Sequence, residues 1–133
     1  MKIFTDTNVL VSALTARGLC ADLFEVILAD HQLIIGEVVL EELERVLLLK
    51  LKVPEKDALQ TLQFLRKQHI QPLPDSVSEL NIRDEDDRWI LESAIQAKAD
   101  ILVTGDKDLL VVAEQVMQLK IISPRQFWDL LKE

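Results

Sequence analysis

The chain is 133 residues long, a length typical of one domain that buries a sizeable core, so we expect residues 1–133 to form a single domain. Hydrophobic residues make up 49% of the sequence, but no apolar run approaches the ~18 residues of a membrane span, and the N-terminus has no apolar signal region. The single cysteine excludes a disulfide framework and indicates a reducing compartment, so we expect a cytoplasmic protein. The formal net charge of −8 argues against a broad basic surface for nucleic acid.

In the first half of the chain, apolar runs of strand length alternate with segments of helical periodicity. The expected elements are a strand at 2–5, a turn or short helix at 9–14, a helix at 21–29, a strand at 33–35 and a helix at 38–50. In the last of these helices, Glu42 lies three residues after Val39 and four before Val46, on the apolar side. We therefore expect Glu42 to face the core or a cleft, and Glu41 and Glu44 to face solvent.

The same alternation continues through the second half of the chain. The expected elements are a helix at 55–67, a weaker strand at 70–73, a polar turn-like segment at 75–82, a helix that begins among the acids at 84–87, a strand at 101–104, a helix at 109–117, a strand at 119–122 and a helix from 124. Buried strands that alternate with helices are typical of a mainly parallel sheet covered on both faces. The sequence therefore predicts an α/β fold.

One of four consecutive acids in the second half has an unusual position. Asp87 lies three residues before Ile90 and four before Leu91, so it shares the apolar stripe of its helix. A charge on the buried side of a helix is costly unless a partner compensates it, which favours a functional role for Asp87. Capping of the helix N-terminus is the simpler interpretation for Asp84 and Asp86.

Two further acids each follow a predicted strand. Asp6 directly follows the first strand, and Asp106 lies just past the fourth. In parallel sheets the site lies beyond the carboxyl ends of the strands, and Glu42 and Asp87 come from helices expected at the same edge. The sequence therefore predicts that these four acids, distant in sequence, converge in one crevice.

Four converging carboxylates cannot all stay ionised without compensation: either some of their pKa values rise, so that these groups bind protons, or cations bind. Because all the candidate ligands are oxygen atoms, the expected ion is a hard divalent cation, either Mg²⁺ or Mn²⁺. Such ions support phosphodiester hydrolysis, since they activate a water molecule and stabilise the leaving oxygen. Asn8 and Thr104 could orient the carboxylates through hydrogen bonds, whereas Asp108 either joins the site or caps the following helix.

Three segments resemble a known family: FTDTNVLVSAL at the start, LEELERVL in the middle and DEDDRWILESAIQAKADILVTGDKDLL towards the end. They are similar to the PIN domain, and in particular to the VapC-like branch that supplies the toxin of type II toxin–antitoxin pairs. The resemblance spans nearly the whole chain and implies a three-layer α/β/α sandwich with a central, mainly parallel sheet. It also implies Mg²⁺- or Mn²⁺-dependent ribonuclease activity, an RNA substrate and an antitoxin partner. The family's metal-binding acids fall on Asp6, Glu42, Asp87 and Asp106.

The sequence departs from the pattern of this family at a few positions. Glu37 stands where similar proteins often have a serine, and it could either join the site or start a helix. Asp84 and Asp86 thicken the acidic wall, which disfavours binding of RNA unless a metal ion is present. The strongly acidic balance of the chain argues in the same direction.

Two other functions are compatible with the residues. A phosphatase with an aspartyl nucleophile would use Asp6, but Asn8 stands where its second acid is expected and no phosphate-binding lysine is clearly placed. A non-catalytic scaffold would keep the acidic pocket only to bind a metal or a partner, and the four intact acids argue against it. Apolar residues near the C-terminus could support a homodimer, although core packing is the favoured interpretation: Phe127, Trp128, Leu130 and Leu131.

Overall fold

The computed structural model describes residues 1–77 and 82–132, and the strands among them form one five-stranded sheet. The strands are β1 (Lys2–Thr5), β2 (Gln32–Gly36), β3 (His69–Gln71), β4 (Ile101–Val103) and β5 (Lys120–Ile122). Their order across the sheet is β3-β2-β1-β4-β5. Every strand pairing within the described residues is parallel, which confirms the expected type of sheet.

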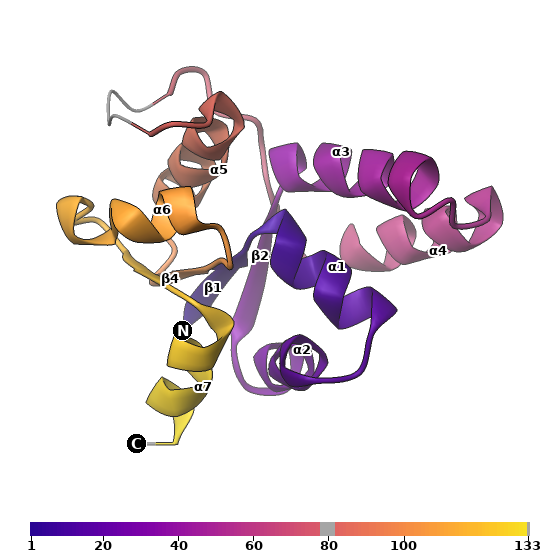
Figure 1. The fold of residues 1–133 in the computed structure, drawn as a ribbon, viewed down its shortest axis with the longest axis horizontal. Helices are drawn as coiled ribbons and strands as arrows, with labels where there is room; N and C mark the ends of the chain where they lie inside the picture. Colours follow the sequence, from indigo (N-terminus) through magenta and orange to yellow (C-terminus); the bar gives the residue numbers. More distant parts are fainter. Residues whose placement is uncertain (78–81, 133) are drawn as a thin grey trace.

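Helices cover both faces of the sheet and give the expected three-layer α/β/α architecture (Figure 1). The α-helices are α1 (Thr7–Thr15), α2 (Leu19–Asp30), α3 (Glu37–Arg45), α4 (Glu55–Leu65), α5 (Glu85–Gln96), α6 (Lys107–Val111) and α7 (Pro124–Leu131). In Figure 1, helices α1 to α4 lie to the right of the strands, and α5 and α6 lie to the left. Helix α7 packs against α2, so the end of the chain returns towards the first group of helices.

The path of the chain through the sheet reverses its direction at β1. From β1 the chain moves outward to β2 and then to β3, whereas the next connection crosses to β4 on the other side of β1. The neighbouring ends of β1 and β4 therefore form a topological switch point, where open parallel sheets hold their sites. Asp6 follows β1, and Asp106 lies three residues after β4.

The segment expected as one helix at 38–50 contains two kinds of helix. The α-helical part, α3, ends at Arg45 and a π-helical turn, η1 (Val46–Lys50), follows it. The Leu51 N–H donates a hydrogen bond of 2.9 Å to the Val46 carbonyl, five residues back, which closes the wider turn. The continuous apolar run of this segment hides the change, because it contains no glycine or proline to mark it.

Two other expected elements differ in extent. The prediction of one helix at 109–117 was wrong, because α6 ends at Val111 and a 3-10 turn, η2 (Ala113–Gln115), follows. Val112 and Val116 are both buried, although the chain between them follows the 3-10 turn. Their spacing of four residues is the same as that of neighbours on one face of an α-helix. Strand β3 ends before Pro72, which has no N–H to donate to a neighbouring strand. Of the turn-like segment expected at 75–82, residues 78–81 lie outside the described residues.

Helix α5 approaches the sheet closely because β2 ends in a glycine. A Cβ atom on Gly36 would lie 2.8 Å from Phe4 Cζ and 2.8 Å from Ser93 Oγ. Phe4 and Ser93 are both fully buried, so neither can easily move aside. This contact fixes α5 against β1 and β2, and with it the acidic start of that helix at the edge of the sheet.

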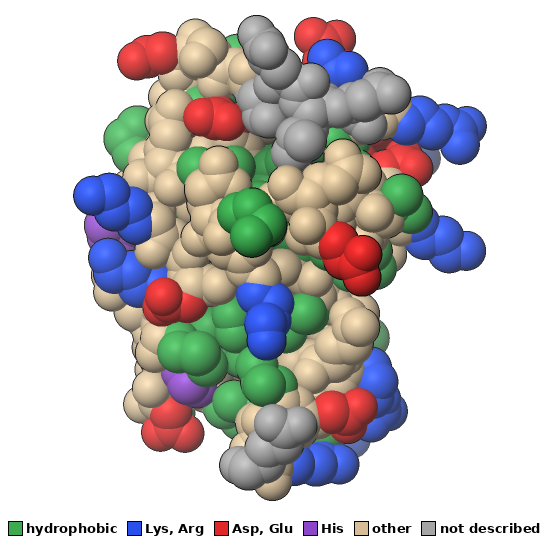
Figure 2. All heavy atoms as spheres, turned by 90° about the vertical axis from the view of Figure 1, so that its left-hand side faces the viewer, with side chains coloured by type: hydrophobic (Ala, Val, Ile, Leu, Met, Phe, Trp, Pro, Cys, Tyr) green, Lys and Arg blue, Asp and Glu red, His purple; other side chains and the backbone are tan. Residues whose placement is uncertain are grey.

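The C-terminal apolar residues contribute to the core, as the favoured interpretation predicted. Phe127 is fully buried, and its three apolar neighbours pack against the core while partly exposed: Trp128, Leu130 and Leu131. None of the helices in the described residues is long and apolar enough to cross a membrane. On the face that lies to the left in Figure 1, acidic, basic and hydrophobic side chains are interspersed (Figure 2).

Candidate metal centre

Asp6 and Asp106 each cap the helix that follows their strand. The Asp6 carboxylate accepts a hydrogen bond from the Thr7 N–H (2.7 Å) at the start of α1. The Asp106 carboxylate accepts one from the Asp108 N–H (2.8 Å) at the start of α6. Carboxylates suit this position because they satisfy free N–H groups and complement the positive end of the helix dipole. Both acids are thereby fixed at the carboxyl edge of the sheet.

Thr104 and Asn8 connect these two acids. The Thr104 hydroxyl donates to Asp6 Oδ2 (2.6 Å) and accepts a hydrogen bond from the Asp106 N–H (2.9 Å). The Asn8 amide donates to Asp6 Oδ2 (3.2 Å), and its carbonyl oxygen accepts from the Gly105 N–H (3.0 Å). The two loops after β1 and β4 are therefore held in a fixed relation, as the orienting roles expected of Thr104 and Asn8 require.

Glu42 and Asp87 reach the same edge from two helices. Helix α3 starts where β2 ends, and full burial of Val39 and Leu43 directs Glu42, which lies between them in sequence, towards the ends of the strands. Helix α5 buries Ile90 on the same stripe as Asp87, whose side chain is only 4% exposed. The expected inward direction of both acids agrees with these positions.

The four predicted acids line a single cleft of about 330 Å³: Asp6, Glu42, Asp87 and Asp106. The other residues of the cleft wall come from α1, α3, η1 and α5: Thr7, Asn8, Val11, Ser12, Val46, Lys50 and Ile90. Asp6 is 2% exposed, whereas Glu42 and Asp106 are half-buried. Side chains that are up to 100 residues apart in the sequence therefore meet at the switch point of the sheet.

The most compact group of acids in the cleft differs from the predicted four. One oxygen atom each from Asp87, Asp106 and Asp108 lies within 4.8 Å of the other two, a closeness that no other such group in the described part of the chain reaches. Asp6 and Glu42 line the cleft outside this group. Asp108 therefore lies among the acids, and the alternative that it caps α6 is wrong because Asp106 is the cap.

Asp87 is the acid whose ionisation is most disturbed. Burial in the protein raises its pKa to about 8, and repulsion from Asp106, Asp84 and Asp6 acts in the same direction. A carboxyl group with such a pKa is mostly protonated at neutral pH unless a cation compensates its charge. Strongly perturbed acids of this kind are typical of functional sites.

Two neighbouring acids are shifted in the same direction. Burial raises the pKa of Asp6, although hydrogen bonds from Thr104 and Thr7 oppose the shift. Burial also raises the pKa of Glu42, and the charge of Asp6 adds to it. The Thr7 hydroxyl lies close enough to lower the pKa of Glu42, yet it has no well-formed hydrogen bond within the described residues. Burial therefore disfavours the ionised forms of both acids.

The donor set of the cleft fits a hard divalent cation. Asp87 Oδ2 is buried and has no hydrogen-bond partner among the described residues, so it is available as a ligand. The donors around it are carboxylate, hydroxyl and amide oxygens, which suit Mg²⁺ or Mn²⁺ rather than a metal that prefers thiolate or imidazole. Mg²⁺ keeps several waters and takes one or two carboxylates directly, which agrees with a close Asp87–Asp106 pair and more distant Asp6 and Glu42.

Other acids near the cleft have structural partners. Glu37 starts α3, and its carboxylate accepts hydrogen bonds of 2.9 and 3.1 Å from the Arg66 guanidinium outside the cleft. Of the two roles that the sequence allowed for Glu37, the structure shows the helix start. Asp84 is the N-cap of α5 and accepts a hydrogen bond from the Asp86 N–H (3.0 Å), as the capping interpretation predicted.

Several residues of the cleft were missed by the sequence analysis, among them Thr7 and Lys50. Thr7 is 3% exposed and lies beside Glu42, but a threonine in the first turn of a helix carries no pattern that would single it out. Lys50 lines the cleft eight residues after Glu42. The concentration of positive charge around Lys50 was the one signal in the sequence that could have identified it.

Known proteins support the same interpretation of the fold. A family model described as PIN domain matches residues 2–108, whereas no curated protein sequence matches the chain. A crystal structure of VapBC2 from Rickettsia felis, bound to a DNA fragment from their promoter, is similar with a TM-score of 0.67 and 21% identity, over 92% of this chain and 98% of that one. A structure of FitAB bound to an IR36 DNA fragment has a TM-score of 0.67 and 19% identity, over 92% and 94% of the two chains. Because the family model covers most of the sequence, and the fold agrees with it, this chain belongs to the PIN domain family.

Proposed function

We propose that this PIN domain protein, acting as a single domain over residues 1–133, is a Mg²⁺- or Mn²⁺-dependent endoribonuclease. The observation that carries the proposal is the state of Asp87, which is buried, lacks a partner for Oδ2 among the described residues and lies against Asp106 and Asp108. A protein keeps such an arrangement at a cost in stability, and a bound cation would remove that cost.

Each acid of the cleft has a role that follows from its position. Asp87 and Asp106 would hold the cation directly, and Asp6 and Glu42 would complete its surroundings. Thr104 and Asn8 would keep Asp6 and the loop before Asp106 in place through their hydrogen bonds. When bound, the cation would supply an activated water molecule and compensate the charge that develops on the phosphodiester.

We further propose that the protein is the toxin of a type II toxin–antitoxin pair. The two similar structures, VapBC2 and FitAB, are complexes bound to DNA, and this chain covers nearly the full length of the chain matched in each. A partner that covers the cleft would silence the ribonuclease without altering its acids. The proposed partners are therefore an RNA substrate and an antitoxin protein.

Cleavage of RNA by the purified protein tests the proposed activity. We expect cutting of a labelled single-stranded RNA with Mn²⁺, none with EDTA, and a loss of at least about 100-fold in Asp6→Asn and Asp106→Asn, since each variant weakens the binding of the metal ion. The matched control is Asp129→Asn, which removes an exposed acid on α7. Equal cutting by the wild type and both cleft variants would contradict the proposal and would point to a contaminating nuclease.

A metal-binding scaffold without activity predicts a different result. It would be stabilised by Mn²⁺ in a melting experiment, as the wild type is expected to be, but it would not cut RNA under any condition. Measuring both properties on the same preparation separates the two functions.

A further inference from the structure

The positive charge of this acidic protein is concentrated in one segment. Residues 45–67, here called the basic arm, contain six Lys or Arg and two Asp or Glu, a net charge of +4, whereas the other 110 residues carry −12. The arm runs from the end of α3 through η1 to the end of α4. On the face that lies to the left in Figure 1, away from α4, charges of both signs are interspersed (Figure 2).

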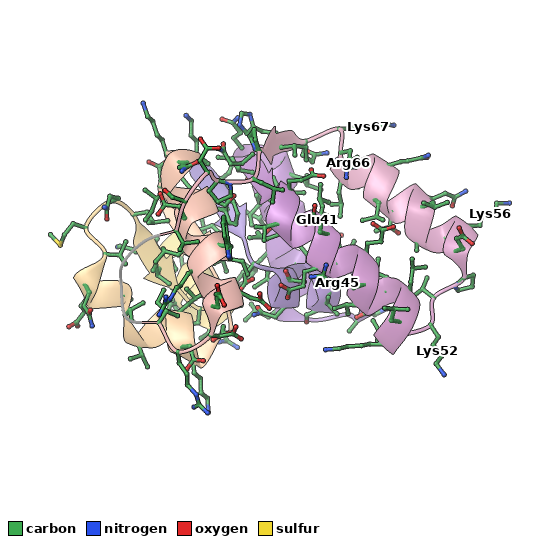
Figure 3. All side chains as sticks on the ribbon, turned by 90° about the horizontal axis from the view of Figure 1, so that it is seen from above. Glu41, Arg45, Lys52, Lys56, Arg66 and Lys67 are labelled. Atoms are coloured by element: carbon green, nitrogen blue, oxygen red, sulfur yellow. The ribbon has the colours of Figure 1, made fainter. Side chains whose placement is uncertain are left out.

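Acids of α3 compensate the basic residues at one end of the arm. Arg66 pairs with Glu37, and its pKa is raised by hydrogen bonding to that carboxylate and by the charges of Glu44 and Glu41. Figure 3 shows Glu41 on α3 near Arg66. Arg66 and Lys56 lie at opposite ends of α4. Arg66 therefore already has an acidic partner on the neighbouring helix.

The basic residues at the other end of the arm lie beside the acidic cleft. Lys50 is part of the wall of the cleft, and a second hollow of about 330 Å³ adjoins it and is lined by Arg45, Lys50 and Asp86 among others. Arg45 and Lys50 are exposed, and neither forms an ion pair with any described residue. Lys52 and Lys56 follow at the outer end of the arm (Figure 3).

The π-helical turn explains how Lys50 comes to line the cleft. In an uninterrupted α-helix, a residue eight positions after Glu42 would have rotated about 80° away from it around the axis. The turn at Val46–Lys50 is wider and rotates each residue by a smaller angle, which cancels part of this drift. Glu42, Val46 and Lys50 consequently line both the cleft and the adjoining hollow. Turns of this type are rare and frequently mark functional sites.

Basic residues thus border the acidic cleft on one side. The start of α5 and the loop after β4 form the acidic wall, and Glu42 of α3 adds a further carboxylate. Lys50 of η1 lines the cleft, and Arg45 lies beside it in the adjoining hollow. We propose that Arg45 and Lys50, with Lys52 and Lys56 beyond them, bind phosphates of a single-stranded RNA and so hold the scissile phosphodiester over the acidic wall. This inference rests on the proposed ribonuclease function and names the surface that binds its substrate.

A polyphosphate chain is the ligand that this arrangement fits. The basic residues extend from the hollow beside the cleft to the outer end of the arm, so they could contact several of the repeating charges of a nucleic acid backbone. A bound chain would approach the acids from the only strongly positive segment of the molecule, which offsets the repulsion expected from a net charge of −8. Contacts of this kind hold the substrate equally in its ground state and transition state, so they act on KM.

The test uses two double variants of the full chain. Arg45→Gln/Lys50→Gln changes the edge of the cleft, and Lys52→Gln/Lys56→Gln changes the outer arm. The control, Lys120→Gln/Arg125→Gln, removes the same charge from exposed positions on β5 and α7. Binding of a fluorescent 12-nucleotide RNA is measured by anisotropy in EDTA over a series of salt concentrations, and cleavage is measured with Mn²⁺.

We expect the Arg45/Lys50 variant to bind RNA at least 10-fold more weakly than the control. The slope of the logarithm of its binding constant against the logarithm of the salt concentration should become shallower by about 1.4, or about 0.7 for each lost phosphate contact. Its KM should rise while kcat changes less than 3-fold, and its stabilisation by Mn²⁺ should match that of the wild type. The Lys52/Lys56 variant should show a smaller effect in the same direction.

Binding to RNA that is equal in the arm variants and in the control would overturn the inference. That result would leave the proposed function intact if the wild type still cuts RNA. Conversely, a wild type that binds RNA through the arm but does not cut it would contradict the ribonuclease function and support the arm. A wild type that binds no RNA even at low salt would overturn the arm as its binding surface.

Discussion

The Thr104 hydroxyl donates a hydrogen bond of 2.6 Å to Asp6 Oδ2, although the two residues are 98 positions apart in the sequence. The same hydroxyl accepts a hydrogen bond from the Asp106 N–H. One fully buried side chain thereby sets both acids at the ends of β1 and β4. A residue that cannot itself carry charge is therefore central to the arrangement of the charged ones.

Thr104→Val should weaken both the fold and the binding of metal. The change removes one of the three hydrogen-bond donors to Asp6 and leaves the Asp106 N–H without its acceptor, which costs about 1–3 kcal/mol of unfolding free energy. Affinity for Mn²⁺ should fall by about 10–100-fold, because the carboxylate of Asp6 loses a group that orients it. Urea unfolding and a Mn²⁺ titration measure the two effects. Thr104→Ser keeps the hydroxyl and should retain most of the affinity for Mn²⁺; equal losses in both variants would contradict this role.

Asp106→Asn should stabilise the metal-free protein. Asparagine can still cap α6, and it removes one negative charge next to Asp87. We expect the melting temperature in EDTA to rise by about 4 °C, equivalent to about 1 kcal/mol. The stabilisation that Mn²⁺ gives to the wild type should disappear in this variant. Undiminished stabilisation by Mn²⁺ would show that Asp106 is not a ligand.

Stability of the metal-free protein should decrease as the pH rises. Asp87 has a pKa of about 8 in the folded protein and an ordinary value of 3.8, so between these values the folded state binds more protons than the unfolded state. Its favourable contribution is present at low pH and is lost as the pH approaches 8. Urea unfolding in EDTA at pH 5.5 and pH 8.5 measures the difference.

Asp87→Asn provides the control for this pH dependence. The variant should lose less stability than the wild type between the two pH values, and the remainder should come from Asp6 and Glu42, whose pKa values are also raised. An equal loss in wild type and variant would mean that Asp87 does not titrate in this range. Stabilisation by Mn²⁺ should increase over the same interval, because the acids must lose their protons to bind the ion.

Glu37→Gln should leave the metal centre unchanged. Glu37 is paired with Arg66, whose side chain is 52% exposed, and such surface pairs contribute about 0–1 kcal/mol. We expect a loss of unfolding free energy within this range and the same Mn²⁺ titration as in the wild type. A clear loss of affinity for Mn²⁺ would return Glu37 to the site.

The positions of the four cleft acids could be predicted because they depend on local rules. Asp6 and Asp106 follow buried parallel strands, and Asp87 and Glu42 share the apolar stripes of their helices. These rules place a side chain at an edge of the sheet or on a face of a helix, and the order of the strands then brings the strand ends that precede Asp6 and Asp106 next to each other. They do not give distances, so they could not show that Asp108 lies beside Asp87 and Asp106.

Other features depend on contacts that no local pattern records. The pairing of Glu37 with Arg66 joins two helices across 29 residues, and the sequence alone left the role of Glu37 open. The π turn that directs Lys50 to the cleft lies within a continuous apolar run, where α-helical and π-helical paths bury the same residues. The helix expected at 109–117 failed for a similar reason, since burial of Val112 and Val116 does not require helical geometry.

The pairing of β4 with β1 has a consequence for the growing polypeptide. Asp106 meets Asp6 only after β4 has paired with β1, and β4 is made after three-quarters of the chain. Nascent chains and truncated translation products that end before β4 lack Asp106 and therefore cannot form the complete acidic cleft. The order of synthesis therefore delays the assembly of the acidic cleft until β4 has been made.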